Sequence, residues 1–212
     1  MKFDHHIHTC RHSPDSEIDP LELVEFAREI GLDGVVITEH DYQWDASELA
    51  ELAELAGPLR VFSGAEVSAR EGHFLVYGLP NLDEVPPGIT VAELVQVVRQ
   101  HDAAVVAAHP FRWDQPFHAI VAELGPVFDA LELVSNNVSW ETRSRTEALL
   151  RRHVMGATGS SDAHGLDDVG CYFTEFDPPI DSMADFVAAV RACRGRPRHR
   201  PGVFLAAGPV DY

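Results

Sequence analysis

The chain opens with a segment that contains Asp4-His5-His6-Ile7-His8-Thr9. If residues 3–9 are extended, successive side chains alternate between the two faces of the strand, so His6 and His8 project to the same side. Two imidazoles that converge on one point make half of a site for a divalent metal such as Zn, Mn or Fe. A solvated, His-rich N-terminus would have the same residues, so the rest of the chain must decide between the two interpretations.

The 212 residues suit one large domain, and 45% apolar content is ordinary for a protein that buries a sizeable core. The sequence has no segment typical of a signal peptide and no run near the roughly 18 apolar residues of a membrane span. We therefore expect a single cytoplasmic domain over residues 1–212, with no membrane partner and with residues 195–212 as a C-terminal tail. The three cysteines are odd in number and far apart, which favours reduced thiols.

The formal net charge is −18, from 34 acidic and 16 basic residues. Such a surface repels a polyanion at long range, so extended nucleic acid is not an expected partner. Bound cations would neutralise part of this charge, so a small anionic substrate is compatible with it. The oligomeric state is not indicated.

Strand-like apolar runs alternate with helical segments along the chain. A helix is predicted from Asp19-Pro20, where an Asp N-cap precedes Pro at the first helical position, to Gly31. The continuous apolar run Gly34–Thr38 is typical of a buried parallel strand. Further strands are expected at 60–67, 73–77, 103–108, 130–134, 154–158 and 172–176, and further helices at 47–56, 90–100, 120–124, 141–152 and 183–192. About seven β/α units predict a parallel sheet, either closed as a barrel or open and doubly wound.

Polar side chains recur at the carboxyl ends of these apolar strands. They are Glu39, His40, Glu66, His109, Asp162 and His164. In β/α barrels this end of the strands forms the rim that carries the chemistry. A single histidine there is more often a capping or core residue, but repeated placement of metal-binding residue types predicts a metal site.

These motifs together resemble the PHP (polymerase and histidinol phosphatase) family of metal-dependent phosphoesterases. The resemblance covers nearly the whole chain, from Asp4 to about Phe176. Its ordered motifs are Asp4-His5-His6-Ile7-His8-Thr9, Ile37-Thr38-Glu39-His40, Gly64-Ala65-Glu66, Gly72-His73-Phe74-Leu75, Ala108-His109-Pro110-Phe111 and Gly159-Ser160-Ser161-Asp162-Ala163-His164. The resemblance implies a distorted seven-stranded (β/α) TIM-like barrel with two or three divalent metal ions, Zn, Mn or Fe, at its rim.

The same resemblance implies three overlapping groups of metal ligands. The first ion would be held by His6, His8, Glu66 and Asp162. Glu66 would bridge to a second ion, which His73 and His109 also hold. His40 and His164 would hold a third ion together with a residue of the first loop, for which Asp15 fits the family pattern best and His12 competes. Glu39 stands where the family usually has Asp, which could alter the hydrogen bonds around the ligands.

A metal centre of this kind predicts hydrolysis of a small phosphomonoester, such as a sugar, amino-alcohol or nucleotide phosphate, by attack of a metal-bridging hydroxide on phosphorus. No side-chain nucleophile is needed, and the sequence has no Gly-x-Ser-x-Gly elbow. The expected catalytic residues are His6, His8, His40, Glu66, Asp162 and His164. A histidine that ligates a metal cannot also be a free general acid, so proton donation by His40 or His164 is doubtful.

An arginine would give a phosphate two-point contacts. Arg112, directly after the His109-Pro110-Phe111 motif, is the first candidate for substrate binding, followed by Arg11 and Arg70. An indole at Trp44, Trp113 or Trp140 could stack on a ring of the substrate or simply close the mouth of the barrel.

Two other classes of function stay open. Related metal centres activate water against C–N bonds, and release of ammonia in place of phosphate would distinguish that reaction. A metal-binding accessory module or a proofreading-type exonuclease is the other alternative, which the complete ligand set and the acidic charge disfavour.

Overall fold

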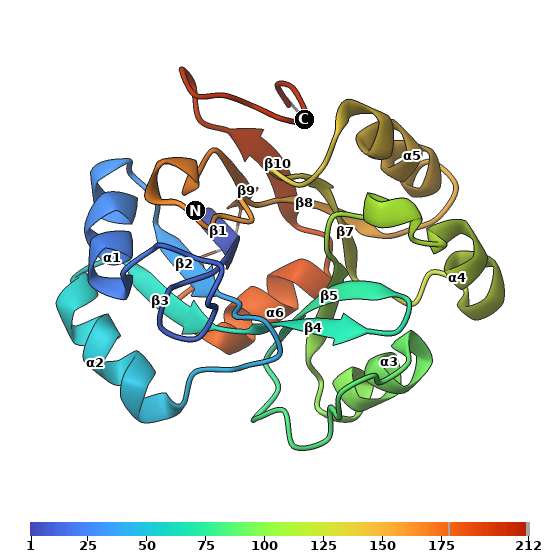
Figure 1. Ribbon diagram of the computed structural model, residues 1–212, viewed down its shortest axis with the longest axis horizontal. Coiled ribbons are helices and arrows are strands. Elements are labelled where there is room, and N and C mark those ends of the chain that lie inside the picture. The colour runs from blue at the N-terminus through green and yellow to red at the C-terminus, as the bar shows by residue number, and fades with distance from the viewer. Residues whose placement is uncertain (178, 211–212) are drawn as a thin grey trace.

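The computed structural model describes residues 1–177 and 179–210. The strands of this part form two five-stranded sheets (Figure 1). The first sheet has the order β10 (Gly195–His199), β9 (Tyr172–Phe176), β1 (Lys2–Ile7), β2 (Gly34–Ile37) and β3 (Arg60–Ser63). The second has the order β4 (Ala65–Ala69), β5 (Gly72–Tyr77), β6 (Ala104–Ala107), β7 (Ala130–Val134) and β8 (Gly156–Gly159).

Both sheets are mixed. β1, β2 and β3 run parallel, as do β6, β7 and β8, and these are the β/α units that the apolar runs predicted. The β4–β5 hairpin pairs antiparallel and joins β6 antiparallel, and β9 and β10 add antiparallel strands beside β1. The periodic pattern of the sequence did not predict these antiparallel pairings, because hydrophobicity alone does not report strand direction.

The predicted strand 60–67 is wrong as a single element. The chain leaves the first sheet after Ser63 and enters the second at Ala65, with Gly64 between them. A Cβ at Gly64 would lie 2.6 Å from the carbonyl oxygen of Val76, so only glycine allows this close crossing. Glu66, which was expected at the end of a long strand, instead lies near the start of β4.

The expected closed seven-stranded barrel is not found among the described residues. The two sheets approach each other through single bridges, between Ile7 and Ala163 and between His40 and Glu66, and not through a continuous ladder. The fold is therefore α/β with two mixed sheets. One bridge lies at the carboxyl end of β1 and the other just after β2, so they draw the predicted functional residues of the two sheets together.

Six α-helices of the described part lie outside the sheets (Figure 1). They are α1 (Pro20–Glu29), α2 (Ala46–Ala56), α3 (Val91–Gln100), α4 (Phe117–Leu124), α5 (Trp140–Leu150) and α6 (Met183–Arg191). The start of α1 is as predicted, because the Asp19 side chain accepts hydrogen bonds from the backbone N–H groups of Leu21 and Glu22. None of the helices described here combines the length and apolar character needed to cross a membrane.

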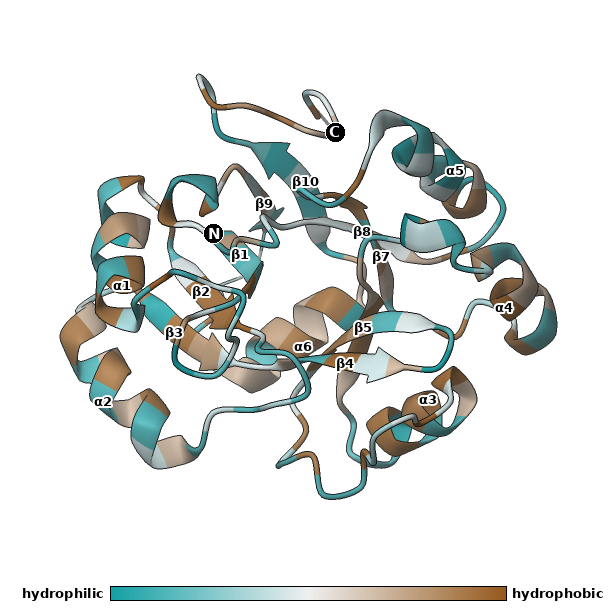
Figure 2. Ribbon diagram, in the orientation of Figure 1, coloured by the Kyte–Doolittle hydropathy of each residue, from teal (hydrophilic) through white to brown (hydrophobic). Residues whose placement is uncertain are grey.

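Helix α6 packs where the two sheets come together at the amino ends of the parallel strands. The ring of Phe186 contacts those of Phe3, Phe176 and Tyr77, at centroid distances of 5.7, 5.4 and 5.1 Å. The apolar residues concentrate in the strands and on the inner sides of the helices (Figure 2). This packing closes one end of the core, and the polar residues at the carboxyl ends of the strands lie at the opposite end.

The expected C-terminal tail at residues 195–212 is wrong over its first part. Residues 195–199 form β10, an edge strand that tolerates Pro197 because only one of its sides is paired. Arg143 of α5 then donates to the carbonyl oxygens of Ala207 and Pro209, at 3.0 and 2.9 Å. Residues 211 and 212 lie outside the described residues.

Candidate metal centre

All nine side chains predicted as metal ligands meet in one connected cluster at the carboxyl ends of the parallel strands. His6 and His8 come from the end of β1, Asp15 from the following loop and His40 from the end of β2. Glu66 and His73 come from the β4–β5 hairpin, His109 follows β6, and Asp162 and His164 follow β8. Both sheets therefore contribute side chains to the cluster. Of the strands that carry them, β4 and β5 are the two that a short turn joins.

Glu66 lies at the centre of the cluster, with 1% of its surface exposed. Its Oε2 lies 3.2 Å from Nε2 of His8, 3.4 Å from Nε2 of His6 and 3.0 Å from Nδ1 of His40. Its Oε1 lies 2.9 Å from Nδ1 of His73 and 3.0 Å from Nε2 of His109. The two carboxylate oxygens thus face two different sets of imidazoles, which is the geometry of a bridging ligand.

Asp162 supplies the second carboxylate. Its Oδ1 lies 3.2 Å from Nε2 of His6 and 3.4 Å from Nε2 of His8, and its Oδ2 accepts a hydrogen bond from Nδ2 of Asn137 at 2.6 Å. Asp162 holds a left-handed backbone conformation with φ of +55°, which Asp tolerates better than most residues. A hydrogen bond from its N–H to the carbonyl oxygen of His6 fixes this turn at 2.8 Å.

The donor atoms fit a divalent cation. The ligand atoms of His6, His8, Glu66 and Asp162 lie within 4.8 Å of one another, and the same is true of Glu66, His73 and His109 and of His8, His40 and His164. Nε2 of His6 and Nε2 of His8 are buried and have no hydrogen-bond partner. Because an unpaired buried polar atom is costly, two such atoms aimed at two carboxylates favour a bound ion between them. Imidazole nitrogen and carboxylate oxygen are ligands of Zn, Mn and Fe.

Glu132 is a functional candidate that the sequence analysis missed. It lies in β7 with none of its surface exposed. Its Oε1 accepts hydrogen bonds from Nδ1 of His6 at 2.9 Å and from Oγ of Ser160 at 2.6 Å, and its Oε2 accepts from the N–H of His109 at 2.8 Å. This places the proton of His6 on Nδ1 and leaves Nε2 free toward the cluster. A charged residue within the apolar run Ala-Leu-Glu-Leu-Val was the available signal.

The first loop contributes Asp15 and not His12 to the cluster. Oδ2 of Asp15 lies 3.2 Å from Nε2 of His40 and 3.3 Å from Nε2 of His164. His12 instead stacks on Tyr42, at a centroid distance of 4.0 Å, and its Nε2 lies 3.1 Å from Glu48. The geometry therefore favours Asp15 of the two candidates.

Glu39, the departure from the family pattern, lies beneath the cluster and is fully buried. It accepts hydrogen bonds from the N–H of Thr9 at 3.0 Å, from Oγ of Ser13 at 2.5 Å and from the indole of Trp44 at 3.0 Å. The longer side chain thus ties the first loop to the end of β2. Trp44 is accordingly a buried structural residue and not a platform for substrate.

The charges of the cluster stabilise one another. Burial lowers the pKa of His6, but the carboxylates of Asp162, Glu132 and Glu66 outweigh burial and raise that pKa well above its usual value. Burial likewise lowers the pKa of His40, whereas Glu66 and Asp15 raise it to about 9. Burial raises the pKa of Glu66, but the neighbouring histidines hold it well below its usual value. Protons and metal ions therefore compete for the same histidines.

Among the three arginine candidates, only Arg112 approaches the cluster, with Nη1 3.9 Å from Oδ2 of Asp162. Arg11 pairs with Glu48 at 3.3 Å, and Nε of Arg70 donates to the carbonyl oxygen of Gly88 at 2.7 Å, so the structure places both away from the cluster. Trp113 is 65% exposed and its ring contacts those of His73 and His109.

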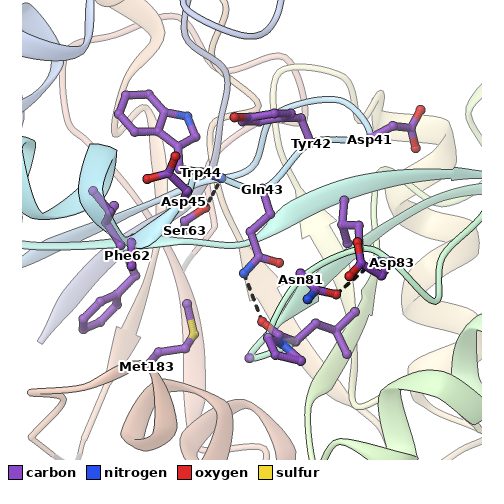
Figure 3. A pocket seen from close by; sticks show the side chains of 16 residues that line it. Asp41, Tyr42, Gln43, Trp44, Asp45, Phe62, Ser63, Asn81, Asp83 and Met183 are labelled. Carbon is purple, nitrogen blue, oxygen red and sulfur yellow. Dashed lines mark hydrogen bonds between the residues drawn. The ribbon is translucent and has the colours of Figure 1, made fainter.

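A cavity of about 610 Å³ lies on the flank of the molecule between β3, the loop after β2 and the loop after β5 (Figure 3). Phe62 and Met183 contribute apolar surface to it, and Nε2 of Gln43 donates to the carbonyl oxygen of Leu79 across it at 3.0 Å. None of the nine cluster side chains lines this cavity, so it is not part of the candidate metal centre.

The described residues thus combine an α/β fold with a buried cluster of histidines and carboxylates at the strand ends, a set of donor atoms suited to divalent metal ions. A family model described as PHP-associated matches residues 141–194. This match covers part of the chain and agrees with the resemblance to the PHP family that the sequence motifs show.

Several proteins are similar to this chain. An uncharacterized protein of Methanocaldococcus jannaschii is 28% identical over 120 residues, which cover 52% of this chain and 68% of that protein. A protein of Bifidobacterium adolescentis, assigned as a metal-dependent phosphoesterase, is 23% identical with a TM-score of 0.62, over 77% of this chain and 87% of that chain. PsfC from Pseudomonas syringae is 23% identical with a TM-score of 0.68, over 90% and 88%.

An amidohydrolase from Chromobacterium violaceum, solved with bound sulfate and no metal, is 16% identical with a TM-score of 0.66, over 90% of this chain and 97% of that chain. At these identities the likeness to solved structures concerns the fold.

Proposed function

We propose that this protein is a phosphoesterase that uses two or three divalent metal ions to hydrolyse a small phosphorylated substrate, such as a sugar, amino-alcohol or nucleotide phosphate. The observation that carries the proposal is the buried Glu66, whose two oxygens face separate sets of imidazoles at 2.9 to 3.4 Å. A carboxylate shared between two adjacent sites supports a multinuclear centre, and such centres suit reactions in which charge develops on several oxygens of one phosphoryl group.

The proposed ligands follow the three groups of the cluster. One ion would lie between His6, His8, Glu66 and Asp162, and a second between Glu66, His73 and His109. A third would lie between His40, His164 and Asp15. Bound divalent ions would supply activated water and would neutralise the phosphoryl oxygens.

The side chains around the cluster would then position the substrate. Arg112 is half-buried and lies near Asp162, so its guanidinium can hold a phosphoryl oxygen at the edge of the centre. His40 and His164 are each 29% exposed and lie on the open side of the cluster. As proposed ligands they are not assigned as proton donors to the leaving group.

The test combines metal analysis with a product screen. Purified protein is analysed for bound metals and incubated with sugar phosphates, amino-alcohol phosphates, nucleotides and a short oligonucleotide, while phosphate and ammonia are both measured. We expect phosphate release from a small ester, loss of that release in His8→Ala, and no loss in His101→Ala, a surface control that pairs with Glu84.

Other outcomes would identify the alternatives. Ammonia without phosphate would indicate hydrolysis of a C–N bond. Cleavage of the oligonucleotide alone would indicate a nuclease; a lesion-specific endonuclease from Pyrococcus furiosus shares this fold at 18% identity and a TM-score of 0.64, over 90% of this chain and 56% of that chain. Bound metal without any product would indicate an accessory module.

A further inference from the structure

A second cavity, of about 290 Å³, adjoins the metal centre on the side of the second sheet. It lies between the loop after β6 and the start of α5, and its lining includes Arg112, Trp113, Asn137 and Arg145. The nine cluster side chains do not line it. The cavity is therefore distinct from the cluster itself.

Two residues that line the cavity, Asn137 and Arg112, also lie next to Asp162 of the cluster. Nδ2 of Asn137 donates to Oδ2 of Asp162 at 2.6 Å, and Nη1 of Arg112 lies 3.9 Å from the same oxygen. Because both residues also line the cavity, a small molecule held at the cluster would have its remainder within reach of this compartment.

Two guanidinium groups, those of Arg112 and Arg145, are the cationic groups that line the cavity. The guanidinium carbon of Arg112 lies 4.0 Å from the centre of the Trp113 ring, and that of Arg145 lies 4.2 Å from the centre of the Phe111 ring. Stacking on an aromatic face fixes a guanidinium while its N–H edge stays available to accept an anion. Within residues 1–177 and 179–210 no carboxylate forms an ion pair with Arg145, although Asp114 and Glu141 also line the cavity and are exposed.

The loop that presents Arg112 holds an unusual backbone. His109, Phe111, Trp113 and Asp114 all have positive φ values, of 26°, 68°, 52° and 56°. Such conformations cost energy in residues other than glycine and are retained where the surrounding structure enforces them, often beside ligands. This backbone conformation turns Phe111 inward, where its ring lies against Arg145, and turns Trp113 outward, where its ring lies against Arg112.

We infer that this cavity binds a second anionic group of the substrate, a phosphate or a carboxylate, while the scissile phosphate lies at the metal centre. The inference rests on the proposed function and narrows its substrate class to phosphate esters with a further negative charge a few bonds from the ester. Arg145 is the residue specific to this group, because Arg112 also faces the centre.

The experiment measures binding as well as turnover. Metal-loaded full-length protein is titrated calorimetrically with glycerol 3-phosphate, which has one anionic group, with 3-phosphoglycerate, which adds a carboxylate, and with propane-1,3-diol bisphosphate, which adds a phosphate. We expect at least one of the two probes with a second anionic group to bind about tenfold more tightly than glycerol 3-phosphate. The comparison of these two probes tells whether the cavity takes a carboxylate or a phosphate.

Arg145→Met keeps the aliphatic stem and removes the charge, so we expect it to reduce the affinity ratio between the probes with two anionic groups and glycerol 3-phosphate to near one. Arg145→Lys should restore part of this ratio. Arg152→Met, which changes an exposed arginine just beyond the C-cap of α5, is the control that should keep the ratio. Equal affinity for all probes in the unaltered protein, or an unchanged ratio in Arg145→Met, would overturn the inference. Preferential binding that Arg145→Met abolishes, without any phosphate release, would sustain the subsite and count against the proposed function.

Discussion

His6 donates a hydrogen bond from Nδ1 to the carboxylate of Glu132 over 2.9 Å, and neither side chain is exposed to solvent. This pair joins β1 of the first sheet to β7 of the second. It holds the imidazole so that Nε2 lies 3.2 Å from Oδ1 of Asp162 and 3.4 Å from Oε2 of Glu66. The orientation of one proposed ligand is therefore set by a residue that does not itself face the ion.

Glu132→Gln is expected to weaken metal binding about 10- to 100-fold, the usual effect of changing a group that orients a ligand. The carboxylate accepts three hydrogen bonds with two oxygens, and an amide nitrogen in place of one oxygen would oppose a donor. Competition with a chelator measures the affinity, and nitrogen NMR shifts of the Zn²⁺-loaded protein report which ring nitrogen of His6 carries the proton.

Glu175→Gln is the matched control for this change, because Glu175 lies on β9 and pairs with Arg198 away from the cluster. Equal metal affinity in the two variants, with the His6 tautomer unchanged, would show that Glu132 contributes packing and does not orient His6.

Removal of the metal ions is expected to lower the free energy of unfolding. A ligand at 100 times its dissociation constant stabilises the folded state by about 2.7 kcal/mol. Asp162→Asn should reduce this gain, since Asn tolerates the left-handed conformation at φ of +55° but lacks the charge. Urea unfolding with and without Mn²⁺ measures the difference, and Asp167→Asn, at an exposed position after β8, should behave like the unaltered protein.

The metal-free protein is expected to lose stability as the pH rises from 6.5 to about 9. Burial lowers the pKa of His40, but Glu66 and Asp15 raise it from 6.5 to about 9. Folding therefore favours the protonated imidazole, and this stabilisation is complete below pH 6.5 and is lost as the pH rises through 9. Burial also lowers the pKa values of His6 and His8, but the neighbouring carboxylates raise them by more. Both histidines therefore stabilise the folded state less as the pH rises, as His40 does.

Urea titrations in the presence of a chelator at several pH values measure this slope. His40→Gln should make it shallower, whereas His101→Gln should leave it as it is. A stability that rises between pH 6.5 and 9 would contradict the ion pairs of the cluster.

Asp15→Asn is expected to release one metal ion more readily, because it removes a carboxylate that lies 3.2 and 3.3 Å from His40 and His164. His12→Gln changes the competing residue of the same loop, which contacts Glu48 and Tyr42, and should leave the metal content intact. Elemental analysis after dialysis distinguishes the two. Loss of an ion only in His12→Gln would reverse the assignment of the first-loop ligand.

Gly34→Ala is expected to cost about 1–3 kcal/mol of stability, as overpacking of a core usually does. A Cβ at this position of β2 would overlap the ring of Phe3 on the adjacent strand β1. Gly165→Ala is the control, since its nearest contact would be Oδ2 of Asp168 at 3.8 Å, and it should change stability by no more than about 0.5 kcal/mol. Chemical denaturation of both variants provides the measurement.

Much of the fold was predictable because the responsible signals are local. The Asp19 cap, the apolar run of β2 and the alternation of strands and helices depend on neighbouring residues, and they predicted an α/β fold. The break at Gly64 and the strand at 195–199 were not predictable in this way. They depend on contacts of Gly64 with Val76 and of Gly195 with Thr174, which lie far away in the sequence.

Residue types along the chain were enough to indicate the chemical character of the candidate centre. His6, His8 and the polar residues expected at strand ends predicted a metal site, because the carboxyl ends of parallel strands share one edge, and the resemblance to the PHP family completed the nine ligand candidates with Asp15 and His73. Which atoms meet depended on the tertiary structure. Oε1 and Oε2 of Glu66 face different histidines, Asp15 and not His12 reaches His40, and Glu132 and Asn137 orient the ligands. Such contacts join residues up to 126 positions apart, so they exist only once packing has fixed the two sheets against each other.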